Sequence, residues 1–444
     1  MSGPPLREER GQGPVDLVLR GVRVLDASGS FDGPVDLATR DGVVTALARH
    51  VARGRDALEV DAAGLWLMPG VVDCHAHIGY PSLDTDEVRT MSAKHRAAEA
   101  AGALRRTLHA GVTLLRDAGG VDAALRDDLA DGRIEGPRLQ VAIAAPGPAG
   151  DQGEGYLSWP AAGPDAQAAA SGRPDGGRGV TGTPVPPRRL PLRTSGPEDM
   201  RAAVRALVSA GADWIKLLAT GGVFSAGDED FPQTIGEPEI AAAVAEAGRW
   251  GRGVMVHAHG GPAVRAAVTA GARSIEHGVY LTEEDARLLA TKGCFFVPTL
   301  TVYHQLVALA DAGGLGTAAA ERARAVGRRL GEAVAIARAA GVRIALGSDA
   351  GDRRHHGGNL AELCHLHRAG LTVEEALLAG TAAGADLCGA GDRAGRLAPG
   401  RDFDAVVLDE DPGDLSCFLR PGAVTGVFLR GAPVLRHRRL DRSG

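Results

Sequence analysis

"VVDCHAHIGY", residues 71–80, places two histidines one residue apart at the end of an apolar run that follows a Pro-Gly pair. Residues two apart in a strand point to the same face, about 6.6–6.8 Å from each other. Asp73, His75 and His77 therefore share one face of the predicted strand, and Cys74 and Ala76 share the other. Two imidazoles on one face can bind one metal ion. Because short motifs also occur by chance, the H-x-H pair alone does not establish a metal site.

Short apolar segments continue from this strand and alternate with helical segments rich in Ala, Leu and Arg, a pattern typical of βα units around a parallel sheet. We expect eight strands, at 71–78, 112–117, 138–145, 213–220, 254–260, 274–278, 294–300 and 343–350. Helices are expected among others at 197–210, 236–251, 316–340 and 373–389, with Ser195 and Thr282 as N-caps. Eight such units close a (β/α)8 TIM-like barrel, here over residues 69–399.

The two ends of the chain carry a different pattern. Alternation typical of half-buried strands occurs near both termini, at residues 15–26, 35–48, 403–411 and 424–435. We therefore expect a small β-sandwich domain built from residues 14–68 and 400–440.

Residues 146–196 interrupt the barrel pattern, because this stretch is too rich in Gly and Pro for regular structure. Long loops in compact domains are usually functional or disordered. The stretch follows the third strand, on the side where barrels carry their active sites. We expect a lid or pocket wall here, with disorder of its middle as the alternative.

Composition limits the partners open to this chain of 444 residues. It is 44% hydrophobic with a formal net charge of −6, so neither nucleic acid nor a membrane is an expected partner. The five cysteines show no C-x-x-C spacing, and the polar N-terminus does not resemble a secretory signal. We expect a cytoplasmic α/β protein that acts on a small molecule and forms a homo-oligomer.

Further metal-ligand residue types recur at the ends of other predicted strands. "VMVHAHG" supplies His257 and His259, "SIEHG" supplies His277, and "RIALGSDA" supplies Asp349. Each residue taken singly is better explained by an ordinary hydrogen bond or a helix cap. Because the carboxyl ends of barrel strands meet at one face, their joint occurrence predicts a shared site.

Lys216, in "DWIKLLATGG", lies within an apolar strand, where a charged ammonium is costly to bury. The chain contains 49 basic Lys and Arg residues, yet only three are lysines. A primary amine can add carbon dioxide and become a carbamate that bridges two cations, which an arginine cannot do. The alternative is a lysine that extends to solvent or pairs with Asp213 or Glu237.

With these motifs the sequence resembles the amidohydrolase superfamily, and within it the branch of imidazolonepropionase-related and prolidase-like binuclear metal hydrolases. The resemblance runs from about residue 14 to 415 and rests on "LMPGVVDCHAHI", "AGVTLLRDAGG", "DWIKLLATGG", "VHAHG", "SIEHG", "VPTL", "GSDA", "HGGN" and "GRLAPGRDFDAVVLDEDP". It implies two divalent cations, with zinc as the expected metal. One would be held by His75, His77 and Asp349, the other by His257 and His277, and N-carboxylated Lys216 would bridge them.

The resemblance also implies how such a centre would work. A hydroxide bridging the two metals would attack the carbonyl carbon of an amide or peptide-like C–N bond. Asp349 would act as general base and then as general acid. His259, Tyr303 and His356 are candidates for contacting substrate, although His259 could instead support a metal ligand and Tyr303 could simply pack in the core. Arg353 and Arg354 could bind a carboxylate or belong to a solvated loop.

The substrate class is less sharply defined. Relatives of this branch often show Gly-Gly-His-Gly after the third strand, whereas the corresponding region here reads "PGPAGDQGEGY" and lacks histidine. This difference puts the dipeptide and N-acyl amino acid substrates of the branch in doubt. The alternatives are a mononuclear deaminase, a hydrolase that opens a cyclic amide of the imidazolone type, and a non-catalytic scaffold.

Overall fold

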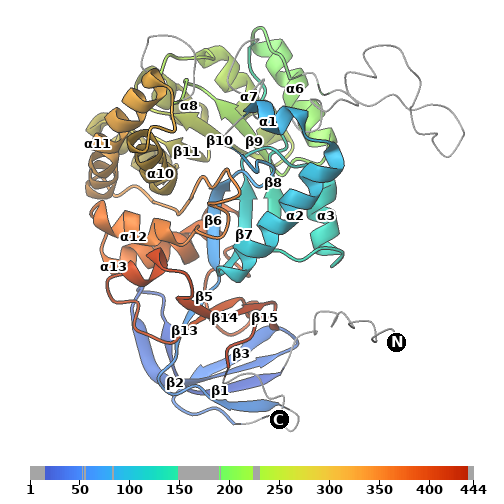
Figure 1. Ribbon diagram of the computed structural model, residues 1–444, viewed down its shortest axis with the longest axis vertical. Coiled ribbons are helices and arrows are strands. Elements are labelled where there is room, and N and C mark those ends of the chain that lie inside the picture. Colours follow the sequence, from blue (N-terminus) through green and yellow to red (C-terminus); the bar gives the residue numbers. More distant parts are fainter. Residues whose placement is uncertain are drawn as a thin grey trace, which may run out of the picture.

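The computed structural model describes residues 16–52, 54, 57–82, 85–148, 190, 192–223 and 231–438. It is a mixed α/β structure in which one large sheet lies below a set of parallel strands surrounded by helices (Figure 1). The core of the predicted loop at 146–196 lies outside the described residues. Among the residues described, no helix is long and apolar enough to cross a bilayer.

The large sheet is formed by strands from both ends of the chain. Its eight strands are β1 (Leu17–Leu25), β2 (Phe31–Arg40), β3 (Val43–Ala48), β4 (Leu58–Asp61), β5 (Trp66–Pro69), β13 (Ala405–Leu408), β14 (Val424–Leu429) and β15 (Ala432–Leu435). The order is β15-β14-β13-β5-β1-β2-β3, and β4 pairs with β1. The antiparallel pairing of β13 with β5 joins the N-terminal strands to the C-terminal ones. The predicted division into two domains at residues 69 and 399 stays a prediction.

Two segments predicted as single strands are hairpins. Residues 35–48 turn at Asp41 and Gly42, whose φ angles are 51° and 78°. Residues 424–435 turn in the same way at Arg430 and Gly431, with φ angles of 50° and 76°. Two successive residues with positive φ are the requirement of the tight turn that fits the twist of paired strands. The alternation of apolar residues continued through each turn and concealed it.

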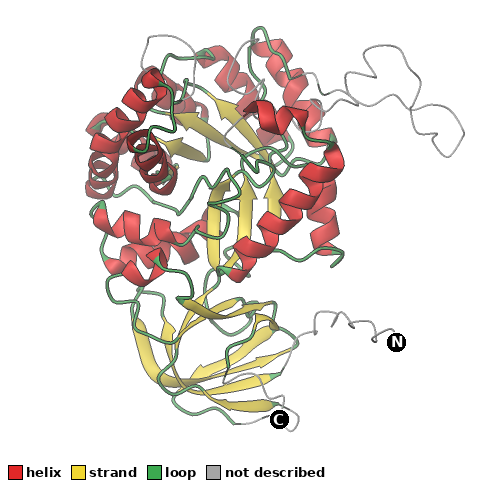
Figure 2. Ribbon diagram, in the orientation of Figure 1, coloured by secondary structure: helices red, strands yellow, loops and turns green. Residues whose placement is uncertain are grey.

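Within the described residues, the α/β part contains seven regular parallel strands, which form two sheets (Figure 2). The three-stranded sheet has β6 (Val71–Ala76), β7 (Val112–Asp117) and β8 (Arg138–Val141) in sequence order. The four-stranded sheet has β9 (Trp214–Leu218), β10 (Gly253–Ala258), β11 (Ser274–His277) and β12 (Phe295–Val297). All side chains of β6, β7 and β9 are buried, which explains why their sequences are mostly apolar and show no alternation of apolar and polar residues.

Helices follow most strands and cover them. They are α1 (Thr85–Thr90), α2 (Ala93–His109), α3 (Ala123–Ala130), α6 (Pro197–Ser209), α7 (Glu237–Arg249), α8 (Gly261–Ala270), α9 (Glu283–Lys292), α10 (Leu300–Asp311), α11 (Thr317–Ala339), α12 (Ala361–Arg368), α13 (Val373–Leu378) and α14 (Gly384–Leu387), with a π-helical turn at Ala379–Ala383. Thr282 caps α9 as predicted, through a reciprocal capping box with Asp285. Ser195 does not cap α6, because the N-cap is Gly196.

The predicted eighth strand, residues 343–350, is not a regular strand. It forms only isolated bridges, from Ile344 to Phe296 and from Ala350 to Ala76. Its backbone groups are shared among several partners: Ala345 N donates to Phe296 O, Leu346 N to Ala379 O, and Ser348 N to the Asp73 carboxylate. A continuous ladder with one neighbour is therefore not formed. The seven strands and this segment do not close a regular barrel in the described structure.

Two predicted strands end early at residues with positive φ. Ile143, with φ 68°, follows β8, and Thr299, with φ 53°, follows β12. A left-handed residue cannot continue a strand, since it turns the chain out of the pleated direction. The second of these residues, Thr299, contacts the predicted site, because its Oγ1 lies 2.7 Å from His277 Nδ1.

Candidate active site

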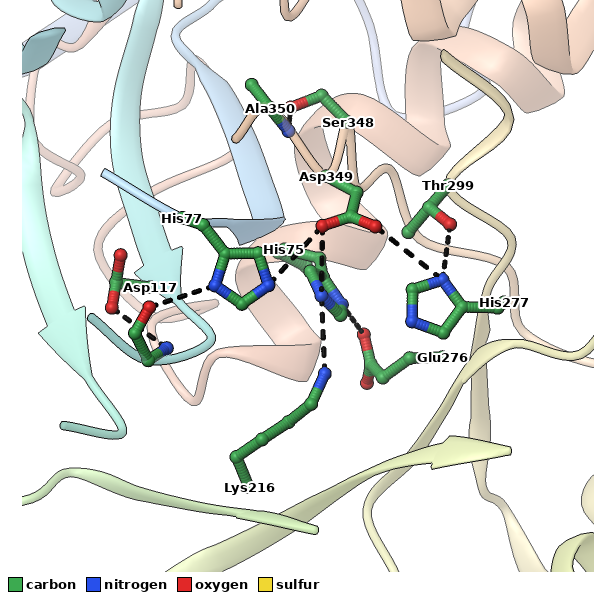
Figure 3. Close-up of polar contacts among 12 residues, drawn as sticks. His75, His77, Asp117, Lys216, Glu276, His277, Thr299, Ser348, Asp349 and Ala350 are labelled. Carbon is green, nitrogen blue, oxygen red and sulfur yellow. Dashed lines mark hydrogen bonds and ion pairs between the residues drawn. The ribbon is translucent and has the colours of Figure 1, made fainter. Parts of the chain in front are cut away.

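Three of the predicted ligand residues meet at one point above the strand ends. His75 comes from β6, His277 from β11, and Asp349 from the segment 343–350 (Figure 3). One ligand atom from each lies within 4.8 Å of the others, a grouping able to hold a metal ion. Asp349 Oδ1 is 3.5 Å from His75 Nε2, and Asp349 Oδ2 is 3.9 Å from His277 Nδ1. The carboxylate thus lies between the two imidazoles.

His77 and Lys216 border the same point. His77 Nε2 lies 3.4 Å from Asp349 Oδ1, and Lys216 Nζ lies 3.3 Å from His75 Nε2. The lysine side chain is 1% exposed and pairs neither with Asp213, which binds Arg126 at 2.9 Å, nor with any other described carboxylate. His75, on β6, and His77, one residue beyond its end, therefore both lie next to the Asp349 carboxylate (Figure 3).

His257 and His259, two apart on and just beyond β10, approach the cluster from the other side. The His257 ring centroid is 4.4 Å from that of His277, and the ring donates from Nε2 to Gly221 O at 3.1 Å. The His259 ring lies 5.6 Å from that of His277 and stacks on Phe231 at 4.1 Å. Although His259 is 1% exposed, neither of its ring nitrogens has a hydrogen-bond partner within the described structure.

Left-handed backbone conformations shape the site. His277 has φ 71°, Asp349 φ 52° and Thr299 φ 53°. Non-glycine residues adopt this region at a cost and tend to do so at functional sites. At His277 the conformation has a specific effect, because neighbours in a regular strand point to opposite faces. Here His277 and the preceding Glu276 both contact the cluster.

Glu276, Arg116 and Thr299 belong to the site and were not assigned from the sequence. Glu276 Oε2 accepts a hydrogen bond from His75 Nδ1 at 2.7 Å, and Arg116 Nη2 binds Glu276 Oε1 at 3.1 Å. Thr299 Oγ1 lies 2.7 Å from His277 Nδ1. All three stand inside quoted or adjacent motifs, "SIEHG", "TLLRD" and "VPTL". A charged residue in a mostly apolar strand was the available signal for Arg116, as it was for Lys216.

Burial sets the charge state of the cluster. It lowers the pKa of His77 and His257 to about 3 and moves the pKa of His75, His259 and His277 well down. The imidazoles are therefore neutral at pH 7 and can donate lone pairs to a cation. Burial also lowers the pKa of the Lys216 amine to about 8 and raises that of Asp349 to about 7.

The remaining predicted contacts lie at the edge of the cluster. The buried Tyr303 ring is 6.0 Å from the His277 ring and 6.1 Å from the His259 ring. His356 donates from Nε2 to His77 O at 3.2 Å and so lies behind the His77 backbone. Arg353 binds Glu99 on α2 at 2.8 Å, and the Arg354 side chain is 75% exposed. Both arginines are thus engaged elsewhere or solvated.

Comparison with known proteins assigns this arrangement to a family. Residues 66–434 match the model of the amidohydrolase family. The chain belongs to the amidohydrolase family. It is a hydrolase acting on carbon–nitrogen bonds. Ochratoxinase of Aspergillus niger is 33% identical over 375 residues, which are 82% of this chain and 75% of the relative.

Solved structures of the amidohydrolase family share the fold. A prolidase complexed with N-methylphosphonate-L-proline aligns with a TM-score of 0.82 and 28% identity, covering 95% of this chain and 100% of the other. The crystal structure of A. niger ochratoxinase aligns with a TM-score of 0.78 and 27% identity over 95% of this chain and 96% of the other. The prolidase-like branch inferred from the motifs is therefore represented among the similar structures.

Proposed function

We propose that the protein is a metal-dependent hydrolase that cleaves an amide or peptide-like C–N bond of a small molecule with the aid of two divalent cations. The convergence of His75, His277 and Asp349 within 4.8 Å carries the proposal. The amidohydrolase family is generally metal-dependent, which supports it. We also infer that β6 to β12 and segment 343–350 make up the (β/α)8 barrel typical of the family.

The donor set fits divalent cations such as zinc. Neutral imidazole nitrogens and a carboxylate oxygen are ligands that Zn²⁺ accepts. We assign one cation to His75, His77 and Asp349, and a second to His257 and His277. When bound, the two cations would bring the pKa of a water molecule near neutrality and polarise the scissile carbonyl.

We assign Lys216 as an N-carboxylated bridge between the two cations. Its amine is buried, its pKa is lowered to about 8, and it makes no ion pair with a described carboxylate. In the neutral form the amine can add carbon dioxide, forming an N–C bond and releasing one proton to solvent. The resulting carbamate carries one negative charge and two oxygens. A buried arginine would remain charged and could not form it.

The chain's own residues then move protons and hold the substrate. Asp349, between His75 and His77, is assigned to take the proton of the attacking water and return it to the leaving nitrogen. His259 is assigned to the substrate, because a buried ring with two unpartnered nitrogens can donate or accept. Tyr303, whose buried ring lies 6.0 Å from the His277 ring, stays a second candidate for contacting the substrate, and His356 stays a third.

The substrate proposal follows the relatives. One is an ochratoxinase, and a similar prolidase structure holds a proline derivative with a phosphonate on its nitrogen. We therefore propose dipeptides and N-acyl amino acids as the first substrates to test and lactams as the next. Homo-oligomerisation and a cytoplasmic location stay predictions from the sequence.

The test combines metal analysis with a hydrolysis screen. Metal content per chain is measured by inductively coupled plasma mass spectrometry, and release of free amine is followed for each substrate class. We expect two ions in the wild type, and in Lys216→Ala at most one ion with activity at least about 100-fold lower. Lys292→Ala, which removes an exposed lysine on α9, is the matched control and should change neither quantity.

Three outcomes separate the alternatives. One ion per wild-type chain with deaminase or ring-opening activity would favour the mononuclear enzyme. Equal activity and metal content in wild type and Lys216→Ala would refute the bridging role. A signal from isotope-labelled bicarbonate, seen by carbon NMR in the wild type and absent from Lys216→Arg, is the direct mark of the carbamate.

A further inference from the structure

A fully buried ion pair lies behind the candidate site. Arg116 on β7 and Glu276 on β11 both have side chains with 0% exposure. Arg116 Nη2 binds Glu276 Oε1 at 3.1 Å and Oε2 at 3.3 Å. Ser274 Oγ also donates to Glu276 Oε1. Strands from the two separate sheets are therefore connected by charged groups within the apolar interior.

The remaining donors of Arg116 are also used. Nε donates to Cys74 O at 2.5 Å, Nη1 donates to Ser274 Oγ at 3.1 Å, and the guanidinium lies 4.6 Å from the Trp214 ring centroid. A buried pair of this kind is weak grounds for stability, since an apolar replacement of equal volume is often no less stable. The presence of this buried ion pair therefore needs an explanation other than stability.

The explanation lies in the contact of Glu276 with the imidazole of His75. Glu276 Oε2 accepts from His75 Nδ1 at 2.7 Å, which fixes Nδ1 as the protonated nitrogen and leaves the Nε2 lone pair facing Lys216 and Asp349. A carboxylate behind a ligating histidine raises the basicity of the ligand nitrogen. Arg116 in turn holds the Glu276 carboxylate in place through hydrogen bonds to both of its oxygens.

Three other histidines of the cluster, His77, His257 and His277, hydrogen-bond to uncharged groups. His77 Nδ1 donates to Gly119 O at 2.9 Å, and His257 Nε2 donates to Gly221 O at 3.1 Å. His277 Nδ1 contacts the Thr299 hydroxyl. Within the described structure, His75 is the histidine of the cluster whose rear nitrogen meets a carboxylate backed by an arginine. The donor strengths on the two sides of the site are therefore unequal.

We infer that Glu276 and Arg116 are positioning residues that make the cation at His75 the more tightly held of the two, so that the site loads and empties in order. The inference rests on the proposed binuclear function. The cation at His257 and His277, whose rings are supported by a carbonyl and a hydroxyl, would be the first to leave. A purely structural role for the pair would instead weaken both cations alike or neither.

The test measures two dissociation constants directly, without relying on activity. Apoprotein is titrated with Zn²⁺ in competition with a chromophoric chelator. In Glu276→Gln, which keeps the side-chain shape and removes the charge, we expect the tighter constant to weaken about 10- to 100-fold and the weaker one to change less than about threefold. Asp285→Asn is the matched control, because Asp285 is a buried carboxylate paired with Arg265 at 3.0 Å and contacts no cluster histidine.

Further variants keep the outcome decisive. If Glu276→Gln does not fold, Ser274→Ala removes one donor to Glu276 and should shift the tighter constant several-fold in the same direction. Equal weakening of both sites, or unchanged constants in a folded Glu276→Gln protein, would overturn the inference while leaving the proposed function intact. A wild type that binds fewer than two ions would instead refute the binuclear proposal itself.

Discussion

Glu362 on α12 offers a sharp test of how the site is held from outside. Its carboxylate accepts from Leu300 N at 2.8 Å and from the amide and hydroxyl of Thr301, both at 2.6 Å. These are the first amides of α10, whose N-cap Thr299 makes no side-chain cap of its own. Glu362 thus caps α10 from another helix and holds Thr299 against His277. Substitution of Glu362 should therefore weaken both the start of α10 and the contact between Thr299 and His277.

The expected loss of unfolding free energy follows from the burial of Glu362 and its hydrogen-bond partners. Glu362 is 0% exposed, and Leu300 and Thr301 are 2% and 3% exposed, so water cannot replace the lost acceptor. Glu362→Gln keeps the contact to Leu300 but turns an amide donor toward the Thr301 N–H, and one buried unsatisfied donor costs about 1–3 kcal/mol. Glu362→Ala leaves its three partners, Leu300 N, Thr301 N and Thr301 Oγ1, unpaired and creates a cavity, for which we expect a loss of about 3–5 kcal/mol in unfolding free energy at pH 5.

The pKa of Glu362 determines whether the stability of the protein rises or falls with pH. Burial raises the pKa of Glu362 from its ordinary 4.5 to about 8. The unfolded chain therefore loses the proton first, so the stability linked to this carboxyl is greatest below pH 4.5 and is lost as pH rises toward 8. At about 1.4 kcal/mol for each unit of pKa, full loss amounts to about 5 kcal/mol. The stability gap between wild type and Glu362→Gln should narrow over this range.

Urea unfolding followed by circular dichroism at pH 5, 7 and 8.5 measures the gap between wild type and variant. A gap that stays constant from pH 5 to 8.5 would refute the titration argument. A Glu362→Ala protein as stable as the wild type at pH 5 would refute the capping role. Glu374→Gln, which alters a nearly unburied carboxylate on α13, is the control and should leave the unfolding free energy within about 0.5 kcal/mol.

Three further predictions concern the site itself. In Gly347→Ala the new Cβ would lie 2.4 Å from Val297 Cγ1 and 2.8 Å from His75 Cβ, so we expect a loss of about 1–3 kcal/mol in unfolding free energy and weaker metal retention on dialysis. Asp73→Ala removes a fully buried carboxylate that accepts hydrogen bonds from Ser348 Oγ at 2.6 Å and Asn359 Nδ2 at 2.7 Å. We expect a loss of about 3–5 kcal/mol in unfolding free energy, measured by thermal denaturation. An unchanged melting temperature would contradict this expectation. Chelation of the metal should abolish hydrolysis and remove about 3 kcal/mol of stability if the ion had been at 100 times its dissociation constant, and added Zn²⁺ should restore both.

Most of the regular strands and helices of the α/β part could be predicted from the sequence. The parallel strands β6, β7, β9 and β10 and the helices α6, α7 and α11 lie within a residue or two of their predicted bounds. Their apolar runs and periodicity are local properties. Residues 343–350 could not be predicted correctly, because their backbone groups bond to β6, β12 and the π-helical turn, which are distant in sequence. The hairpins at Asp41 and Arg430 were missed because alternation continued across the turns.

The sequence by itself determined which residue types were present at the strand ends: the histidine pair at the end of β6, the histidines near β10 and β11, Asp349, and a lysine in a chain whose basic residues are mostly arginines. Only the tertiary structure decided which of them face one another and what stands behind each. Glu276 is 201 residues from the histidine that it supports, and Glu362 is 61 residues from the helix start that it caps. Such contacts depend on how separate strands and helices pack, and on single left-handed residues such as His277. Neither the packing of distant elements nor a single left-handed residue produces a periodic pattern in the sequence.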